Sequence, residues 1–418
     1  MKIKDKLAIL ADAAKYDASC ASSAATQRKS SRSEGELGST GGMGICHSYT
    51  PDGRCVSLLK ILFTNHCIFD CSYCINRSSS AIKRASFTVS EVVWLTIEFY
   101  KRNYIEGLFL SSGVVGTPDD TMGQLIEVGR RLRLVEGFRG YIHLKAVAGC
   151  SSELVQKAAL YADRISSNIE LPQQADLNAL APGKKHEVIE EGMATTRELV
   201  DEAKDDRKKR KSTPITATGQ STQMIVGATP GSDQELLDKA DRLYNNYRLK
   251  RVYYSAYSPI PDCDPRLPGK SPPLVREHRL YQADWLMRFY GFSVAEIAPL
   301  SEPNLSLDKD PKHAWALRNR GDFPVDINKA EKSQLLRVPG LGARSVEKIL
   351  AARRHRALRF DDLSKMGVRT KLSRYFIQTS DHNPYLAQLD GLSLESETKK
   401  SYQPSLFESF ASASGGEV

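Results

Sequence analysis

The sequence lacks any run of about 18 apolar residues, the length that a helix needs to cross a bilayer. Its first twenty residues mix charged and apolar side chains, and they have neither the continuous apolar stretch nor the small-residue cleavage site of a secretory signal. No internal repeat occurs at solenoid spacing. We therefore expect a cytoplasmic protein that is neither bound to a membrane nor built from repeats.

Cysteine is scarce and unevenly placed. Six of the eight cysteines precede residue 75, and three of these lie within eight positions. Because the cytoplasm is reducing, thiolate ligands, catalytic groups or buried packing residues are expected in preference to disulfides. Clustering of this kind favours metal binding.

The net charge of +9 is also unevenly distributed. Residues 310–375 contain 16 Lys and Arg against 7 Asp and Glu, a surplus of +9 that leaves the rest of the chain close to neutral. The basic surface is therefore expected in the C-terminal part.

Apolar runs and amphipathic stretches alternate along the first 260 residues. The runs lie at 57–64, 107–112, 141–146, 164–171, 222–227 and 251–257, and helical patterns lie around 89–102, 119–135, 151–161, 187–204 and 232–247. Strands that alternate with helices favour a parallel sheet with right-handed crossovers. Six such units predict an α/β fold, a partial (β/α)6 TIM-like barrel that is open rather than closed.

A chain of 418 residues is too long for one efficient core, so more than one domain is expected. We predict an N-terminal helix with a Ser/Gly-rich loop and a cysteine-bearing segment at 1–56, the barrel at 57–300, a small all-α domain at 301–380 and a polar tail at 381–418. Residues 205–220 are expected to form an exposed basic loop.

Three cysteines follow the first predicted strand in the segment TNHCIFDCSYCINR. Cys67, Cys71 and Cys74 have C-x3-C-x2-C spacing. Three thiolates on one loop can hold a 4Fe-4S cluster and leave one iron open to a further ligand. The alternative is a zinc site, which needs a fourth ligand in closed geometry, with His66 as the adjacent candidate.

The spacing, the aromatic Tyr73 before the third cysteine and the position after the first strand together resemble the radical S-adenosylmethionine (SAM) superfamily. The resemblance implies that the amine and carboxylate of SAM chelate the open iron. An electron from the cluster would cleave the sulfonium to a 5'-deoxyadenosyl radical, with a low-potential donor such as flavodoxin or ferredoxin as partner. The protein would orient the cofactors and exclude water and oxygen.

The resemblance also implies contacts to SAM at the carboxyl ends of later strands. LFLSSGVVG stands where the family receives the methionyl amine, although the usual acidic residue is absent. SSNIEL stands where the family binds ribose and carboxylate, and TQMIVGATPGSD resembles its adenine-contacting strand and turn. Ordinary strand ends with turn residues are the alternative. The candidates are Tyr73, Ser111, Ser112, Gly113, Ser167, Asn168, Glu170, Val226, Gly227 and Ala228.

The remaining cysteines allow two interpretations. Cys20, Cys46 and Cys55 precede the barrel and would hold an auxiliary iron-sulfur cluster with a fourth ligand from elsewhere, or they are buried free thiols. Cys150 and Cys263 follow the third and sixth strands, where core packing is expected unless they face the cavity.

The segment VDINKAEKSQLLRVPGLGARSVEKILAARR predicts two helices joined by a tight turn. Asn328 stands near the start of the first helix, and successive N–H groups at the start of the second form an anion site. VPGLG followed by a helix resembles the helix-hairpin-helix motif, which implies a grip on the DNA backbone that does not read sequence. FDDLSKMGVRTKLSRYF at 360–376 resembles a degenerate second copy. A hairpin used for packing or protein contact is the alternative.

Phosphate contacts are expected from the turn and from the basic side chains around it. These residues are Pro339, Gly340, Leu341, Gly342, Arg344, Lys348, Arg353, Arg354, Arg369 and Lys371.

The predicted barrel and the predicted hairpin module together resemble a family of radical SAM proteins that is assigned to DNA modification or repair. The resemblance implies a radical SAM enzyme that acts on nucleic acid, most plausibly double-stranded DNA. One rival is an RNA-modifying radical SAM enzyme that acts on tRNA. Another is a non-enzymatic, redox-sensing iron-sulfur protein that binds DNA. The sequence specifies neither the reaction product nor the oligomeric state.

Overall fold

The structure is a computed structural model that describes residues 1–14, 44–49 and 55–384. The described residues form two compact units: residues 1–231 with 239–277, and residues 232–238 with 278–384. The predicted boundary at residue 300 lies inside the second unit. No helix in the described part of the chain is long and apolar enough to span a bilayer.

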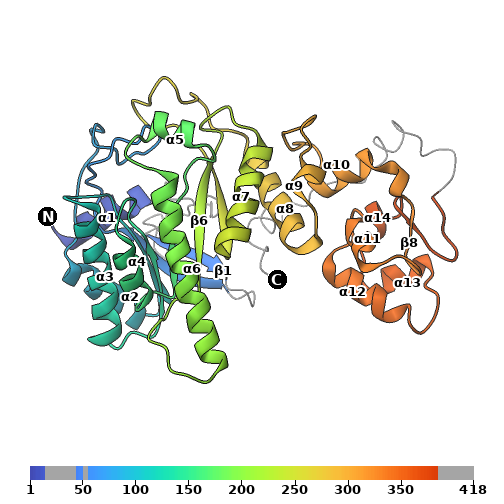
Figure 1. Cartoon of the computed structure of the whole chain (residues 1–418), viewed down its shortest axis with the longest axis horizontal. Helices are drawn as coiled ribbons and strands as arrows, with labels where there is room; N and C mark the ends of the chain where they lie inside the picture. Colours follow the sequence, from blue (N-terminus) through green and yellow to red (C-terminus); the bar gives the residue numbers. More distant parts are fainter. Residues whose placement is uncertain (15–43, 50–54, 385–418) are drawn as a thin grey trace, which may run out of the picture. The chain divides into compact units, whose positions relative to one another are not determined.

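The first unit contains one seven-stranded sheet whose order follows the sequence, β1 to β7 (Figure 1). β2 to β7 are parallel, which confirms the six-stranded parallel sheet predicted from the sequence. β1 was not predicted, and it pairs with β2 in the antiparallel direction. The strands are β1 (Ile45–Tyr49), β2 (Cys55–Leu62), β3 (Gly107–Ser111), β4 (Tyr141–Lys145), β5 (Arg164–Ser166), β6 (Gly219–Val226) and β7 (Arg251–Ala256).

Helices connect successive parallel strands, as parallel pairing requires. They are α2 (Val89–Lys101), α3 (Pro118–Leu134), α4 (Ser152–Ala159), α5 (Gln174–Leu180), α6 (His186–Lys208) and α7 (Asp233–Tyr247), and α1 (Ile3–Ala13) precedes the sheet. Thr88 and Thr117 fix the starts of α2 and α3 in capping boxes with Glu91 and Asp120. α2, α3, α4 and α6 lie side by side as one layer against the sheet (Figure 1).

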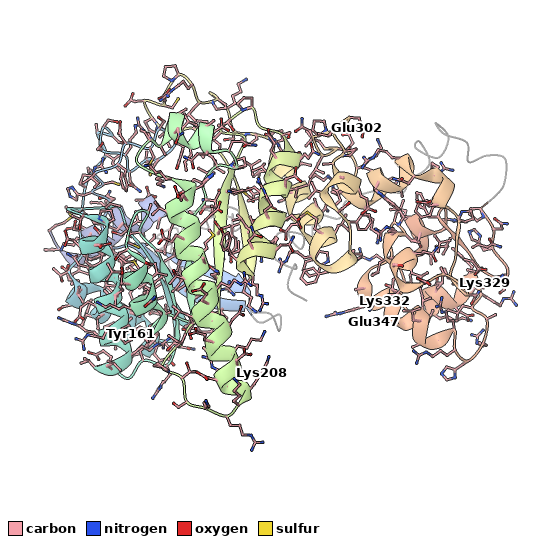
Figure 2. The ribbon with its side chains drawn as sticks, viewed as in Figure 1. Tyr161, Lys208, Glu302, Lys329, Lys332 and Glu347 are labelled. Atoms are coloured by element: carbon pink, nitrogen blue, oxygen red, sulfur yellow. The ribbon has the colours of Figure 1, made fainter. Side chains whose placement is uncertain are left out.

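Two predicted boundaries were wrong. The strand predicted at 164–171 ends at Ser166, because the next residues leave the ladder and Ile169 donates its N–H to the Thr222 hydroxyl. Pairing resumes at Glu170, which bridges to Met224 with φ +66°. The basic loop predicted at 205–220 is shorter, because α6 continues to Lys208 (Figure 2) and β6 begins at Gly219.

The second unit is largely helical. It contains most of α8 (Leu274–Tyr290), then α9 (Val294–Ile297), α10 (Pro311–Arg318), the 3-10 turn η3 (Arg320–Asp322), α11 (Lys332–Arg337), α12 (Ala343–Ala352), α13 (Phe360–Lys365) and α14 (Thr370–Ser373). The two-residue strands β8 (Val325–Asp326) and β9 (Ile377–Gln378) pair in parallel, so the unit is not wholly α. Lys332 and Glu347 lie 3.9 Å apart (Nζ–Oε1) between α11 and α12 (Figure 2).

The four short helices form two pairs, α11 with α12 and α13 with α14, and a left-handed glycine stands in each turn. Gly340 has φ +83° and Gly367 has φ +76°. A Cβ on Gly340 would lie 3.3 Å from the Ser373 nitrogen of α14, and one on Gly367 would lie 4.0 Å from the Lys348 ammonium of α12. Each turn therefore approaches the second helix of the other pair.

Asn328, which the sequence places near the start of the first hairpin helix, lies before α11 and does not cap it. Glu331 is the N-cap, and it forms a capping box with Gln334. The Asn328 side chain instead bonds both the N–H and the carbonyl of Leu358. It joins the segment before α11 to the segment before α13.

Candidate functional site

A cavity of about 390 Å³ opens at the carboxyl ends of the parallel strands. Since the ends of all six parallel strands, β2 to β7, border one cavity, these strands curve around it, and this edge is where barrel active sites are built. The strand ends that line it are Leu62, Ser111, Lys145, Ser167, Ile225 and Ser255.

Cys67, Cys71 and Cys74 all line this cavity. They lie on the cysteine loop, residues 67–74, directly after β2. The loop is joined to its surroundings by backbone hydrogen bonds: Ile68 N–H to the Val114 carbonyl (2.8 Å) and Ser72 N–H to the Leu180 carbonyl (2.7 Å). The structure thus brings the three predicted ligands together at one wall of the cavity.

Side chains from distant segments hold the cysteine loop in place. The Arg84 guanidinium donates to the carbonyls of Asn65, Asn76, Arg77 and Ser80. Those carbonyls flank the loop on both sides, so one charged side chain sets the conformation of the whole turn.

A second anchor comes from the segment after β7. Ser72 donates a 3.0 Å hydrogen bond to the Asp264 carboxylate, and Arg266 joins that carboxylate to the Ala179 carbonyl in α5. This second anchor was invisible in the sequence, because Asp264 and Arg266 lie almost 200 positions from Ser72.

Burial raises the pKa of the Cys71 thiol and raises that of Cys74 to about 12. A buried thiolate therefore needs a cationic centre beside it, and a bound metal supplies one. In the part of the chain that is described, no three His, Cys, Asp or Glu side chains converge on a single-ion site. Ligands of a cluster need not converge in that way, because each iron takes its own thiolate.

Four further polar side chains line the cavity with buried atoms that have no hydrogen-bond partner among the described residues. They are the hydroxyls of Tyr73, Ser111 and Tyr257 and the side-chain carbonyl oxygen of Asn76. Each unpaired buried polar group costs about 1–3 kcal/mol. A polar ligand in the cavity would satisfy these atoms, so the residues present fit a bound cofactor. Sequence reasoning named Tyr73 and Ser111, whereas nothing local marks Asn76 or Tyr257.

The departure of β5 from the ladder exposes three predicted residues to the cavity: Ser167, Asn168 and Glu170. Asn168 donates a 3.1 Å hydrogen bond to the Gln223 side chain of β6. Glu170 pairs with Lys184 at 2.8 Å. Lys184 also lines the cavity, and the sequence did not identify it. Local interruptions of a strand commonly redirect side chains at sites of this kind.

The other predicted SAM contacts divide into two groups. Tyr73, Ser112 and Gly113 line the cavity, whereas Val226, Gly227 and Ala228 do not. Val226 and Ala228 are buried in the core, and Ile225 lines the cavity instead. Gly227 makes a turn with φ +74°, where a Cβ would lie 2.9 Å from Pro272.

The predicted auxiliary cluster finds little support in the described residues. Cys20 and the side chain of Cys55 lie outside them, and Cys46 packs in an apolar cluster with Leu58 and Phe109. Cys150 lines the cavity, and burial raises its pKa to about 11. Cys263 is half-buried in the segment after β7, outside the residues that line the cavity.

In the second unit, the predicted contacts surround the turn between α11 and α12, which contains Pro339, Gly340, Leu341 and Gly342. Most of the basic side chains named from the sequence are exposed: Arg344, Lys348, Arg354, Arg369 and Lys371. Arg353 is half-buried, and it donates to the carbonyls of Ile327 (3.0 Å) and Ala330 (2.6 Å). One nitrogen of its guanidinium is thus already engaged by the backbone.

No family model and no curated protein matches this chain. Among solved structures, it is similar to HydG, a maturase of the FeFe-hydrogenase, with a TM-score of 0.38 and 14% identity over 53% of this chain and 48% of that one. The similarity to a HydG structure from Carboxydothermus hydrogenoformans has a TM-score of 0.42 and 12% identity. It covers 59% of this chain and 56% of that one. The chain thus spans about half the length of these structures.

Proposed function

We propose that this protein is a radical SAM enzyme whose 4Fe-4S cluster is held by Cys67, Cys71 and Cys74. The observation that carries the proposal is the position of these three cysteines. They share one cavity with the ends of six parallel strands and with buried polar atoms that lack partners in the described part of the chain. Three thiolates leave one iron open, which is the opening that a second cofactor requires.

The cluster and SAM, when bound, supply an electron and a 5'-deoxyadenosyl radical. The chain's own residues bind and orient these groups. Ser111 and Tyr257 offer hydroxyl groups that lack partners among the described residues, and Asn168 is held toward the cavity by Gln223. An apolar cluster that includes Leu171 and Leu177 packs against the cysteine loop and helps to exclude water.

We further propose that the substrate is nucleic acid, most plausibly double-stranded DNA, and that the second unit binds it. The basic surplus lies in residues 310–375, and exposed Arg344, Lys348, Arg369 and Lys371 surround two turns that are built alike. Two similar turns with basic neighbours suit the two phosphate backbones of a duplex. If the target is a base, it leaves the stack to reach the cavity.

The test is anaerobic reconstitution with iron and sulfide, followed by dithionite and SAM, with 5'-deoxyadenosine as the readout. We expect Cys71→Ala to abolish its formation. Cys150→Ala is the matched control, because Cys150 lines the same cavity outside the motif. Cleavage in Cys71→Ala would refute the assignment of the cluster to these cysteines. No cleavage in the wild type would refute the radical SAM assignment and favour a redox-sensing role for the protein.

Addition of duplex DNA or of tRNA tests the substrate class. Duplex DNA is expected to increase 5'-deoxyadenosine formation and to bind with an affinity that falls steeply with salt. Stimulation by tRNA alone would assign the enzyme to RNA modification instead.

A further inference from the structure

A buried ion pair forms part of the cavity wall beside the cysteine loop. The Lys184 ammonium lies 2.8 Å from the Glu170 carboxylate, and their side chains are only 12% and 9% exposed. Both residues line the cavity. Burying two charges costs several kcal/mol of desolvation free energy per ion, which the attraction between them offsets only in part. A gain in folding stability therefore does not explain why Lys184 and Glu170 are buried as a pair.

The backbone of Glu170 adds a second cost. Its φ of +66° is left-handed, a conformation that costs a residue other than glycine about 1–3 kcal/mol. The bridge to Met224 and the Ile225 N–H bond to the Glu170 carbonyl (2.7 Å) hold it there. The strained backbone of Glu170 thus fixes its carboxylate beside Lys184.

Lys184 is also fixed relative to the cysteine loop. It follows α5, whose last residue, Leu180, accepts the N–H of Ser72 from that loop. Gly183 faces the Phe69 ring so closely that a Cβ would lie 2.7 Å from it. The segment that carries the lysine therefore packs directly on the segment that carries the cysteines.

The Lys184 ammonium lies beside the cysteine loop. It is 5.8 Å from the centre of the Tyr73 ring, and Tyr73 stands between Cys71 and Cys74 in the sequence. Lys184 and the three cysteines line the same cavity. A cation is thus fixed next to the loop that carries the three thiols.

We propose that Lys184, held by Glu170, is a positioning residue that offsets the negative charge of the cluster thiolates and makes the cluster easier to reduce. The inference rests on the proposed function, since it requires a cluster on the three cysteines. Reduction adds an electron to a group that already carries thiolate charge. A fixed cation nearby stabilises the reduced state more than the oxidised state and raises the reduction potential.

The experiment is a redox titration of the reconstituted protein without SAM, followed by electron paramagnetic resonance of the reduced cluster. We expect Lys184→Met to shift the midpoint potential to more negative values and Glu170→Gln to shift it to more positive values. Lys184→Arg keeps the charge, so its potential should stay near that of the wild type. Opposite shifts from the two ends of one pair are not expected from general damage to the site.

Lys239→Met is the matched control. Lys239 is a buried lysine that pairs with Glu190 at 2.5 Å in the same unit, and neither residue lines the cavity. Its loss should leave the potential unchanged. Iron content and melting temperature, measured for every variant, identify any protein that does not fold.

Equal potentials in all variants, or shifts of the same sign from Lys184→Met and Glu170→Gln, would overturn the proposal. So would a Lys184→Met protein that loses affinity for SAM at an unchanged potential, because Lys184 would then be a ligand contact. If Lys184→Met takes up no iron, the test rests on the Glu170→Gln protein. A midpoint potential of Glu170→Gln that is no higher than that of the wild type then refutes the proposal. A wild type that takes up no cluster would instead refute the proposed function.

Discussion

The Lys312 ammonium of α10 donates a 2.5 Å hydrogen bond to the carbonyl of Leu341, in the turn between α11 and α12. Lys312 is 7% exposed, and its charge lies 4.8 Å from the centre of the Tyr290 ring. The Tyr290 hydroxyl in turn accepts the N–H of Ala343. The side chains of Lys312 and Tyr290 therefore hold the proposed phosphate-binding turn in place by hydrogen bonds.

Burial lowers the pKa of Lys312 from 10.5 to about 7, and Asp310 opposes that change. Between these pH values the unfolded chain keeps a proton that the folded chain has released, so the unfolding free energy rises with pH. Below about pH 7 both states carry the proton, and the cost of burying the charge is fully present. Lys312→Met removes this dependence. Its stability relative to wild type should therefore be highest below pH 7 and should fall by up to about 1.4 kcal/mol per pH unit above it.

Denaturant unfolding at several pH values between 6 and 10 measures this difference. Lys329→Met is the control, because Lys329 is 86% exposed and its loss should give the same difference at every pH. A Lys312→Met difference that does not change with pH would show that the amine keeps its proton throughout the range.

Gly113 illustrates how closely the cysteine loop fits the end of β3. A Cβ at this position would lie 2.2 Å from the carbonyl oxygen of His66, the residue before Cys67. We expect Gly113→Ala to displace the loop, to cost about 1–3 kcal/mol of stability and to abolish iron uptake. Gly123→Ala in α3 is the control, since its Cβ would meet nothing within 4 Å. Iron content after reconstitution and melting temperature measure both effects, and full iron content in Gly113→Ala would contradict the expected fit.

The parts of the site that could be predicted are those whose residues lie within one short segment of sequence. The cysteine motif with Tyr73 follows β2, and Ser111 and Ser112 lie at the end of β3; both strands were recognisable as apolar runs. Their shared position at one cavity follows because parallel strands end at the same edge of a sheet.

The parts that could not be predicted are brought together only by the tertiary fold. Lys184 and Tyr257 lie over 100 and 180 positions from the cysteine loop, and neither stands in a recognisable motif. The strand predicted at 164–171 was too long because its strand-like pattern continues through residues that leave the ladder after Ser166. Net charge likewise did not reveal that the Arg353 guanidinium donates to two backbone carbonyls.

Gly340 allows the proposed role of the turn to be tested separately from the chemistry of the cavity. Its φ of +83° is unfavourable for alanine by about 1–2 kcal/mol, and a Cβ would lie 3.3 Å from the Ser373 nitrogen. Gly340→Ala should therefore distort the turn and weaken binding to duplex DNA, while 5'-deoxyadenosine formation without DNA stays unchanged. Gly321→Ala is the matched control in the same unit, because its Cβ would meet nothing within 4 Å. Fluorescence anisotropy at two salt concentrations gives the affinity and its salt dependence. If Gly340→Ala binds as tightly as Gly321→Ala, the turn does not contact the backbone, and the exposed arginines and lysines of α12 and α14 become the remaining candidates for nucleic-acid binding.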